Sequence, residues 1–234
     1  MISIIIPALN EAAALPVTLQ WVASQSAAWE VIIADGGSSD DTILIANQFA
    51  DRHCCADRMR VIAATRGRAA QMNAGATVAT GEWLLFLHAD TLLPAGALDA
   101  IEALDPSYKF GGFHHAFDGD DWRLRLVSAI HNFRCRRSGV FYGDQAMFVR
   151  RTTFQRLGGF PAVRHLEDVM FSEQLLRHAK SVFLTLPVIT SARKFITAGI
   201  WRSLYRCLVI IAAYRWGGRD LHLKPAARFF NDVR

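Results

Sequence analysis

Short apolar runs alternate with segments of helical periodicity in the N-terminal part of the chain. Runs rich in Ile, Val and Leu predict strands at Ile2–Ile6, Glu30–Ala34, Arg60–Ala64 and Trp83–His88. Between them, apolar spacing predicts helices at Leu15–Ser24, Thr42–Ala50 and Arg68–Ala79. Continuous hydrophobic strands separated by helices are typical of a parallel sheet covered on both faces. We therefore predict an α/β fold with a Rossmann-like, mainly parallel central sheet.

The pattern changes after residue 105. It predicts a strand at Phe110–Phe117, a partly basic helix at Trp122–Arg137, a short strand at Ala146–Val149 and a helix at Glu167–His178. A last helix with apolar and basic faces begins near Ile196. We expect a main domain at residues 1–195 and an appended C-terminal helical segment at residues 196–234.

Composition narrows the class of protein. The chain has 234 residues, of which 52% are hydrophobic, so a disordered chain is excluded. It holds 4 Cys, two of them adjacent, which favours reduced thiols over a disulfide scaffold. We find no basic leader and no apolar run of about 18 residues, the length that spans a bilayer. These features predict a cytoplasmic protein.

The net charge of +5 lies in one segment. Residues 199–234 contain seven basic and two acidic side chains, whereas the remaining 198 residues contain 19 of each. Nucleic-acid binding needs a basic face on the body of the fold, so we expect no nucleic-acid partner.

Polar or glycine-rich residues follow all four N-terminal strands. Ligands of parallel α/β sheets bind beyond the carboxyl ends of the strands, and these residues would meet there. In chain order they are Pro7, Asn10 and Glu11, then Asp35, Gly36 and Ser38, then Arg66, Gly67 and Arg68, and finally His88, Ala89 and Asp90.

Two aspartates at strand ends each have a functional and a structural interpretation. Asp35 is placed to accept hydrogen bonds from a base or ribose, but an Asp-Gly-Gly-Ser sequence also makes a good turn. Asp90 is placed to hold Mg²⁺ or Mn²⁺ at a diphosphate, or to cap a helix that starts near Pro94. A lone histidine such as His88 is more often structural than a ligand.

Three further groups of residues are candidates for catalysis or ligand binding. Glu167 and Asp168 open a helix, where carboxylates are stabilised by the helix dipole or serve as a general base. The arginines at Arg66 and Arg68, and Arg193 further on, suit a diphosphate but are also typical of solvated surface.

Taken together, these motifs resemble family 2 glycosyltransferases, which have the GT-A fold. The matching stretches are SIIIPALNE (residues 3–11), DGGSSDDT (35–42), GEWLLFLHAD (81–90), GGF (158–160) and the Glu167–Asp168 pair. Three others resemble a bacterial subgroup described as radical-SAM/selenodomain-associated transferases: RGRAAQMNAGA (66–76), YGDQA (142–146) and TSAR (190–193). The ordered series spans about residues 1–195.

The resemblance implies a nucleotide-diphospho-sugar donor, UDP- or GDP-linked, and a role for each matching residue. Pro7, Asn10, Glu11, Asp35, Gly36 and Ser38 would line the nucleoside pocket, with Arg66, Gly67, Arg68, Ala89 and Arg193 completing the nucleotide site. Gly143, Asp144 and Gln145 would contact the acceptor or donor sugar. Asp90, with His88, would carry Mg²⁺ or Mn²⁺. Asp168 matches the family's catalytic base, with Glu167 beside it in an inverting displacement.

Two departures from the family pattern qualify this interpretation. His88 stands where the family has the first aspartate of Asp-x-Asp, which leaves fewer carboxylates for a metal. The Gln/Arg-x-x-Arg-Trp motif of processive synthases is absent, so we expect a single transfer rather than polymerisation.

Alternatives stay open. A non-catalytic nucleotide-sugar-binding module that regulates a membrane partner also fits His88. A nucleotidyltransferase fits less well, because no glycine-rich basic loop follows the first strand. The C-terminal segment, with Trp201 and interspersed arginines, is typical of a helix at a membrane interface, on its own domain or in a homodimer. A lipid-linked acceptor would favour peripheral contact with the cytoplasmic membrane face through residues 199–234.

Overall fold

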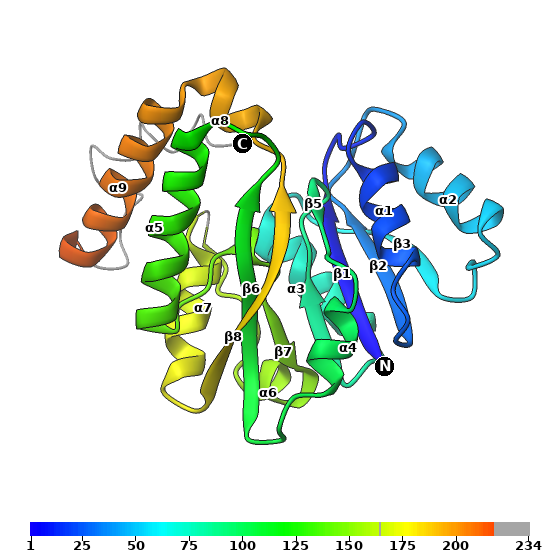
Figure 1. The fold of residues 1–234 in the computed structure, drawn as a ribbon. Helices are drawn as coiled ribbons and strands as arrows, with labels where there is room; N and C mark the ends of the chain where they lie inside the picture. The colour runs from blue at the N-terminus through cyan, green and yellow to red at the C-terminus, as the bar shows by residue number, and fades with distance from the viewer. Residues whose placement is uncertain (164, 218–234) are drawn as a thin grey trace.

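The computed structural model describes residues 1–163 and 165–217. These residues form an eight-stranded sheet in the order β3-β2-β1-β4-β7-β6-β8-β5, flanked by helices (Figure 1). The expected α/β class with a Rossmann-like sheet is confirmed. Residues 218–234 of the expected C-terminal segment lie outside the described residues.

The N-terminal half is the parallel part of the sheet. Its elements are β1 (Ile2–Ala8), α1 (Leu15–Ala23), β2 (Trp29–Asp35), α2 (Thr42–Arg52), β3 (Met59–Ala63), α3 (Arg68–Val78) and β4 (Trp83–Phe86). β1 pairs in parallel with both β2 and β4, and β2 pairs in parallel with β3. Each element lies within about two residues of its expected bounds, and the carboxyl ends of the four strands share one edge.

The C-terminal half has mixed strand directions. Its elements are β5 (Thr91–Leu92), α4 (Ala97–Glu102), β6 (Tyr108–Phe117), α5 (Trp122–Ser138), the 3₁₀ helix η1 (Gly143–Gln145), β7 (Phe148–Arg150), α6 (Arg151–Arg156), α7 (Glu167–Leu176), β8 (Lys180–Thr190), α8 (Arg193–Ala198) and α9 (Ile200–Gly217). Among the described residues of this half, β7 runs antiparallel to β4 and β6, β5 runs antiparallel to β8, and only β6 and β8 pair in parallel.

Two hydrophobic cores lie on opposite faces of the sheet, because successive strand side chains point to opposite sides. On β1, Ile4 and Ile6 pack against residues of α1, α2 and α4. The intervening Ile5 packs against residues of α3, α6 and α7, including Met72 and Phe171. The sheet is therefore covered on both faces, which fixes the positions of the strand ends.

The C-terminal helix α9 packs on its own domain. Ile200 joins Leu124 of α5 in a small separate core, and Tyr214 donates a hydrogen bond of 2.7 Å from its hydroxyl to Glu173 Oε2 of α7. Figure 1 shows α9 beside α5, on the flank opposite α1 and α2. Among the helices that the structure describes, none is both long and apolar enough to cross a membrane.

Candidate active site

Asp35 organises the turn that follows β2. Its side chain is buried, and its Oδ2 accepts hydrogen bonds from Gly37 N at 2.8 Å and Ser38 N at 3.0 Å. Oδ1 accepts from Ser38 Oγ at 2.5 Å. Gly37 has a φ of 89°, which favours glycine. The turn-forming role of Asp35 is therefore present, and base binding by the same carboxylate stays a prediction.

The loop after β1 is tied to this turn. Asn10 has a left-handed φ of 56°, donates from its backbone N to Ser38 Oγ at 2.9 Å and accepts from Ser39 N at 2.8 Å through Oδ1. Glu11 N donates to Thr42 Oγ1 at 2.9 Å. The predicted nucleoside residues of the first two strand ends thus form one connected rim, with Pro7 half-buried at the end of β1.

Gln71, for which the sequence pattern made no prediction, connects this rim to the loop before α3. Its buried amide nitrogen donates to the carbonyls of Ala8 at 2.7 Å and Ala34 at 2.8 Å, at the ends of β1 and β2. Its Oε1 accepts from Gly67 N at 3.3 Å. A glutamine directly after two alanines, in a helix with four alanines, is the signal that could have found it.

Gly36 leaves the space that this amide occupies. A Cβ built on Gly36 would lie 3.0 Å from Gln71 Cδ, closer than ordinary van der Waals contact. Gly36 and Gly67, both predicted nucleotide residues, therefore contact one buried side chain. Arg66 and Arg68 flank Gly67 and are exposed.

A second group of predicted residues meets around Asp168. Asp168 Oδ2 accepts from Gly143 N at 2.5 Å, and Oδ1 accepts from Val169 N at 2.7 Å. A Cβ on Gly143 would lie 2.6 Å from His88 Nε2 and 3.3 Å from Asp168 Oδ2. The structure thus brings the end of β4, the 3₁₀ helix η1 and the start of α7 together, although they are far apart in sequence.

Arg68 links the two groups of residues. Its Nη1 lies 3.7 Å from Oε1 of Glu167, whose side chain is only 4% exposed. Burial raises the pKa of Glu167 to about 7, and the adjacent Asp168 adds to that rise while Arg68 opposes it. Burial likewise raises the pKa of Asp168, against the effect of Arg68 and Gly143 N–H. A raised pKa makes a carboxylate a better proton acceptor near neutral pH.

Asp144 lies beside two histidines for which the sequence pattern made no prediction. Its carboxylate oxygens are 3.4 Å from Nε2 of His131 on α5 and 3.8 Å from Nε2 of His115 on β6. Burial lowers the pKa of His131 to about 4. At neutral pH that imidazole is therefore uncharged, and Asp144 keeps its negative charge next to it.

Gln145 is used inside the protein. Its Oε1 accepts from Tyr142 N at 3.2 Å and from Cys135 Sγ at 2.7 Å, and its Nε2 donates to Phe113 O at 3.3 Å. The amide fixes η1 against β6 and α5. Gln145 is completely buried, whereas the Asp144 side chain is about a third exposed, so Asp144 is the better placed of the two for a sugar hydroxyl.

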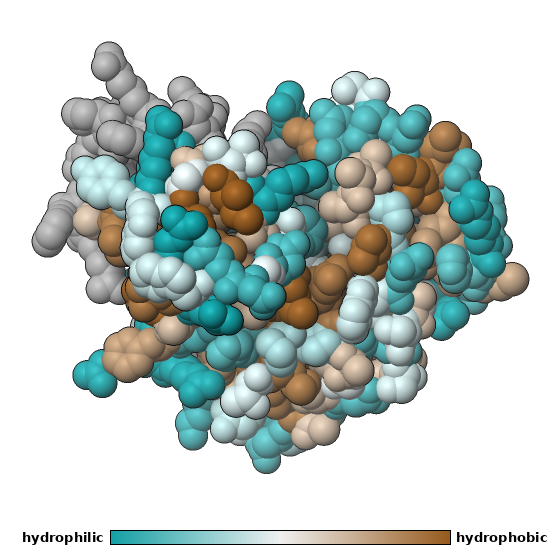
Figure 2. Space-filling view, turned by 45° about the horizontal axis from the view of Figure 1, so that its top comes forward, coloured by the Kyte–Doolittle hydropathy of each residue, from teal (hydrophilic) through white to brown (hydrophobic). Residues whose placement is uncertain are grey.

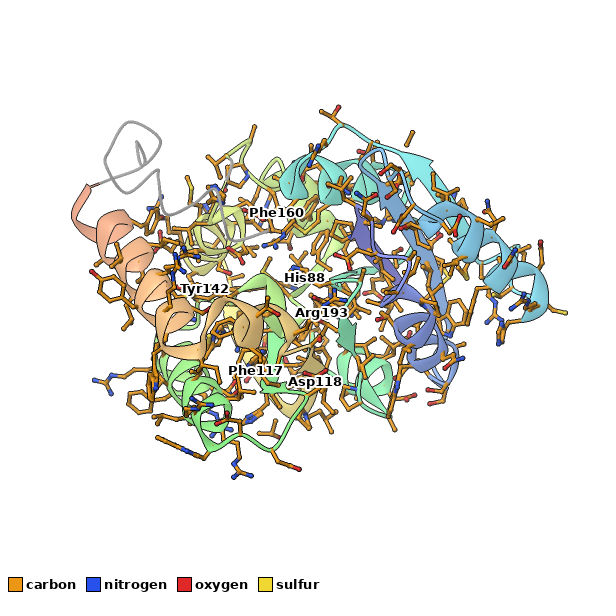
Figure 3. All side chains as sticks on the ribbon, turned by 90° about the horizontal axis from the view of Figure 1, so that it is seen from above. His88, Phe117, Asp118, Tyr142, Phe160 and Arg193 are labelled. Atoms are coloured by element: carbon orange, nitrogen blue, oxygen red, sulfur yellow. The ribbon has the colours of Figure 1, made fainter. Side chains whose placement is uncertain are left out.

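The segment after β4 lies next to the start of α8. The carbonyl of Asp90 accepts from Ser191 N at 3.1 Å, and the buried Ala89 carbonyl accepts from Thr18 Oγ1 at 2.7 Å. In Figure 3, His88 and Arg193 lie near the centre of the molecule, between the half with α1–α3 and the half with α8 and α9. The alternative that Asp90 caps the next helix is wrong, because α4 begins at Ala97 with Gly96 as its N-cap.

The side chains near the end of β4 suit a divalent cation only in part. Among residues 1–163 and 165–217, no three His, Cys, Asp or Glu side chains gather closely enough to hold a metal ion. Asp90 supplies a carboxylate, which suits Mg²⁺ or Mn²⁺, and His88 an imidazole. This set fits a cation that takes most of its ligands from a bound diphosphate and water, rather than a closed protein site.

A family profile decides the classification. The profile described as Glycosyl transferase family 2 matches residues 3–159, more than half of the chain. The chain belongs to this family. It is 38% identical over 163 residues to a PGL/p-HBAD biosynthesis glycosyltransferase of Mycobacterium bovis, covering 67% of this chain and 58% of that protein. It is 26% identical over 208 residues to an undecaprenyl-phosphate 4-deoxy-4-formamido-L-arabinose transferase of Sodalis glossinidius, covering 86% and 60%.

Solved structures share the fold of this chain. The mannosyltransferase PcManGT of Pyrobaculum calidifontis, in complex with GDP-Man and Mn²⁺, matches with a TM-score of 0.66 at 22% identity, covering 80% of this chain and 56% of that one. S. aureus TarS 1-349 matches with a TM-score of 0.64 at 17% identity, covering 97% and 68%. The expected GT-A fold is confirmed. The chain spans only 58% of the mycobacterial relatives it matches.

Proposed function

We propose that this chain is an inverting glycosyltransferase that moves one sugar from a nucleotide-diphospho-sugar to an acceptor hydroxyl. The observation that carries the proposal is the position of Asp168. This buried carboxylate is held by two backbone N–H groups, beside Gly143 and His88, and Arg68 connects its neighbour Glu167 to the rim of strand ends. Family membership and the fold support the same interpretation.

The donor would occupy the rim at the strand ends. Pro7, Asn10, Glu11, Asp35 and Ser38 would contact the nucleoside, and Arg66, Arg68 and Arg193 would neutralise its diphosphate. Arginine suits this task because its planar fork donates two parallel hydrogen bonds to phosphate oxygens. The partly exposed Asp144 carboxylate would accept a hydrogen bond from a sugar hydroxyl.

In the transfer step, Asp168 would take the proton of the acceptor hydroxyl. The acceptor oxygen would form a bond to the anomeric carbon while the bond from that carbon to the β-phosphate oxygen breaks. The leaving oxygen would keep the electron pair, and the configuration at the anomeric carbon would invert. Two backbone N–H donors hold the Asp168 carboxylate in one orientation, which favours catalysis by positioning.

We propose Mg²⁺ or Mn²⁺ as the cofactor, held by Asp90 with His88 nearby. When bound, the cation would stabilise the negative charge of the departing nucleoside diphosphate. The complex of PcManGT with GDP-Man and Mn²⁺ supports a divalent metal in a protein of the same fold.

The acceptor is proposed to be lipid-linked. The Sodalis glossinidius relative is named for transfer involving undecaprenyl phosphate. A lipid-linked acceptor would place the protein in the cytoplasm at the periphery of the membrane, with the C-terminal segment as its contact.

Nucleotide binding measured by calorimetry tests the donor and metal assignments. We expect UDP or GDP to bind more tightly with Mn²⁺ or Mg²⁺ than without, and Asp90→Ala to lose the metal-dependent part. Asp51→Ala, which removes an exposed carboxylate from α2, is the matched control and should bind as wild type. Equal metal dependence in Asp90→Ala and wild type would refute the metal role.

The second candidate is a non-catalytic nucleotide-sugar-binding module that regulates a membrane partner. The motivating observation is His88 at the family's aspartate position, together with the lack of a three-ligand metal group in the described residues. Release of nucleoside diphosphate from any nucleotide sugar in a donor panel, by transfer or hydrolysis, would exclude this candidate.

A further inference from the structure

The flank formed by α5, α8 and α9 exposes large apolar side chains on helices that already bury their opposite faces. On α5, Trp122, Leu126, Ile130 and Phe133 follow helical spacing and form one stripe, in which Phe133 is 69% exposed. The opposite face of α5 buries residues such as Leu124 and Cys135. The exposed stripe is therefore additional to the face that anchors the helix.

A second apolar stripe continues the first. Ile196 of α8 and Trp201, Tyr205 and Leu208 of α9 are all exposed. The rings of Trp122 and Trp201 approach to 6.2 Å between centroids, which joins the two stripes into one surface. We call these eight residues the α5–α9 face. Soluble proteins seldom leave so many large apolar side chains together in water.

The helices that carry this face are basic. The sequence of α5 contains five arginines and no Asp or Glu, and the sequence of residues 193–217 contains five basic residues and no Asp or Glu. Arg125, Arg136 and Arg137 on α5 and Arg202 on α9 are exposed. In Figure 2, the flank next to the grey residues mixes brown apolar residues with teal hydrophilic ones.

We propose that the α5–α9 face docks on an anionic lipid bilayer. A helix lying in a membrane interface has an exposed apolar stripe flanked by arginine and lysine, with Trp and Phe among the apolar residues. Negatively charged headgroups attract arginines, at roughly 1 kcal/mol for each one near the surface. Two helices that present such stripes side by side hold the domain in one orientation.

The charge distribution disfavours a second copy of the chain on this face. In a two-fold dimer the same patch lies on both subunits, so the arginines of one copy would face those of the other. Like charges opposed across an interface are costly. An anionic bilayer covers the same apolar surface without this repulsion.

The face adjoins the proposed active site. α5 is followed along the chain by η1, which carries Gly143 and Asp144, and α8 begins at Arg193, two residues after Ser191, whose backbone N donates to the carbonyl of Asp90. Docking through the outer sides of α5 and α9 would therefore hold the proposed active site next to the bilayer. The inference deepens the proposed function, because it brings a lipid-linked acceptor hydroxyl to the side of the proposed site that holds Asp144.

Vesicle co-sedimentation of the full chain, without donor, tests the inference. Wild type should bind vesicles of mixed phosphatidylglycerol and phosphatidylcholine and release them at high salt. Phe133→Glu and Trp201→Glu, one on each helix, should each reduce binding by roughly tenfold, since each removes a large apolar contact and adds a repelled charge. Leu44→Glu changes an exposed apolar residue of α2 on the opposite flank and should bind as wild type.

A variant that changes only surface charge keeps the test valid even where the apolar-to-Glu variants misfold. Arg125→Gln with Arg137→Gln alters only exposed side chains of α5 and should weaken binding by about fivefold for each arginine. Thermal unfolding and nucleotide binding should match wild type in all variants. Nucleotide binding thus tests the proposed function separately from the docking surface.

Three outcomes would overturn the inference. Wild type could fail to bind the anionic vesicles. The variants on α5 and α9 could bind as well as Leu44→Glu. Light scattering could also show a wild-type dimer that Phe133→Glu dissociates, with no vesicle binding, which would make the face a dimer interface.

Discussion

Glu167→Gln should stabilise the protein at alkaline pH and leave its stability at acidic pH nearly unchanged. The Glu167 carboxyl is buried, and its Oε1 has no hydrogen-bond partner among the described residues. The half-exposed Arg68 lies 3.7 Å away, and the next residue is a second buried carboxylate, Asp168. Ionising Glu167 in the folded protein is therefore unfavourable.

The magnitude follows from the pKa. Burial and Asp168 raise the pKa of Glu167 from 4.5 to about 7. The folded protein then holds this proton to higher pH than the unfolded chain does. The free energy of unfolding falls as pH rises from about 4.5 to about 7, and the full penalty, about 3 kcal/mol, applies above pH 7. The glutamine side chain does not ionise in this pH range, so the free energy of unfolding of Glu167→Gln should not show this decline.

Urea unfolding at several pH values between 5 and 8 measures the effect. Wild type and Glu167→Gln should differ by up to about 3 kcal/mol near pH 8 and converge toward pH 5. The control Glu102→Gln removes an exposed carboxylate that pairs with the N-terminus, and should change stability by about 1 kcal/mol or less at every pH. Parallel pH profiles for wild type and Glu167→Gln would refute the assignment of a buried, unfavourably ionised Glu167.

Three further substitutions test the site. Gln71→Leu leaves the buried backbone groups that this amide pairs without a partner. It should lower the free energy of unfolding, measured in urea, by roughly 1–3 kcal/mol and weaken nucleotide binding measured by calorimetry. An unchanged free energy of unfolding would contradict this role. Gly143→Ala forces a Cβ against His88 and should reduce turnover by about 100-fold in a coupled assay for released nucleoside diphosphate. Turnover at the wild-type rate would contradict this expectation and show that η1 is free to shift. Asp144→Asn should raise the KM for the sugar substrate by roughly tenfold, since it removes a charge-assisted hydrogen bond to a sugar hydroxyl. Nucleotide binding should change little. An unchanged KM would exclude that contact.

The N-terminal half of the fold could be predicted because its pattern is local. Ile2–Ala8 and Trp29–Asp35 are continuous buried strands, and their helices show ordinary apolar spacing. The strand directions of the second half could not be predicted. β8 pairs with β6, about 70 residues earlier, and is only partly buried over most of its length, so its pattern carries little signal.

Some contacts of the proposed site could likewise be predicted from the sequence, and others could not. Strand ends collect at one edge of a parallel sheet, so the linked positions of Asn10 and Ser38 followed from topology. The meeting of His88, Gly143 and Asp168 followed only from the family resemblance. Gln71 was missed because its partners come from distant elements, and His131 was missed because a single polar residue in a helix has no periodic signature.

Nucleoside-diphosphate release from a panel of nucleotide sugars, with wild type and Asp168→Asn compared under identical conditions, tests the central claim most directly. Wild type should turn over at least one donor. Asp168→Asn should bind that donor with similar affinity but turn it over about 100- to 10,000-fold more slowly, the loss expected for a general base. Asp51→Asn, an exposed substitution on α2, should match wild type. Turnover by Asp168→Asn at the wild-type rate would contradict the proposed mechanism.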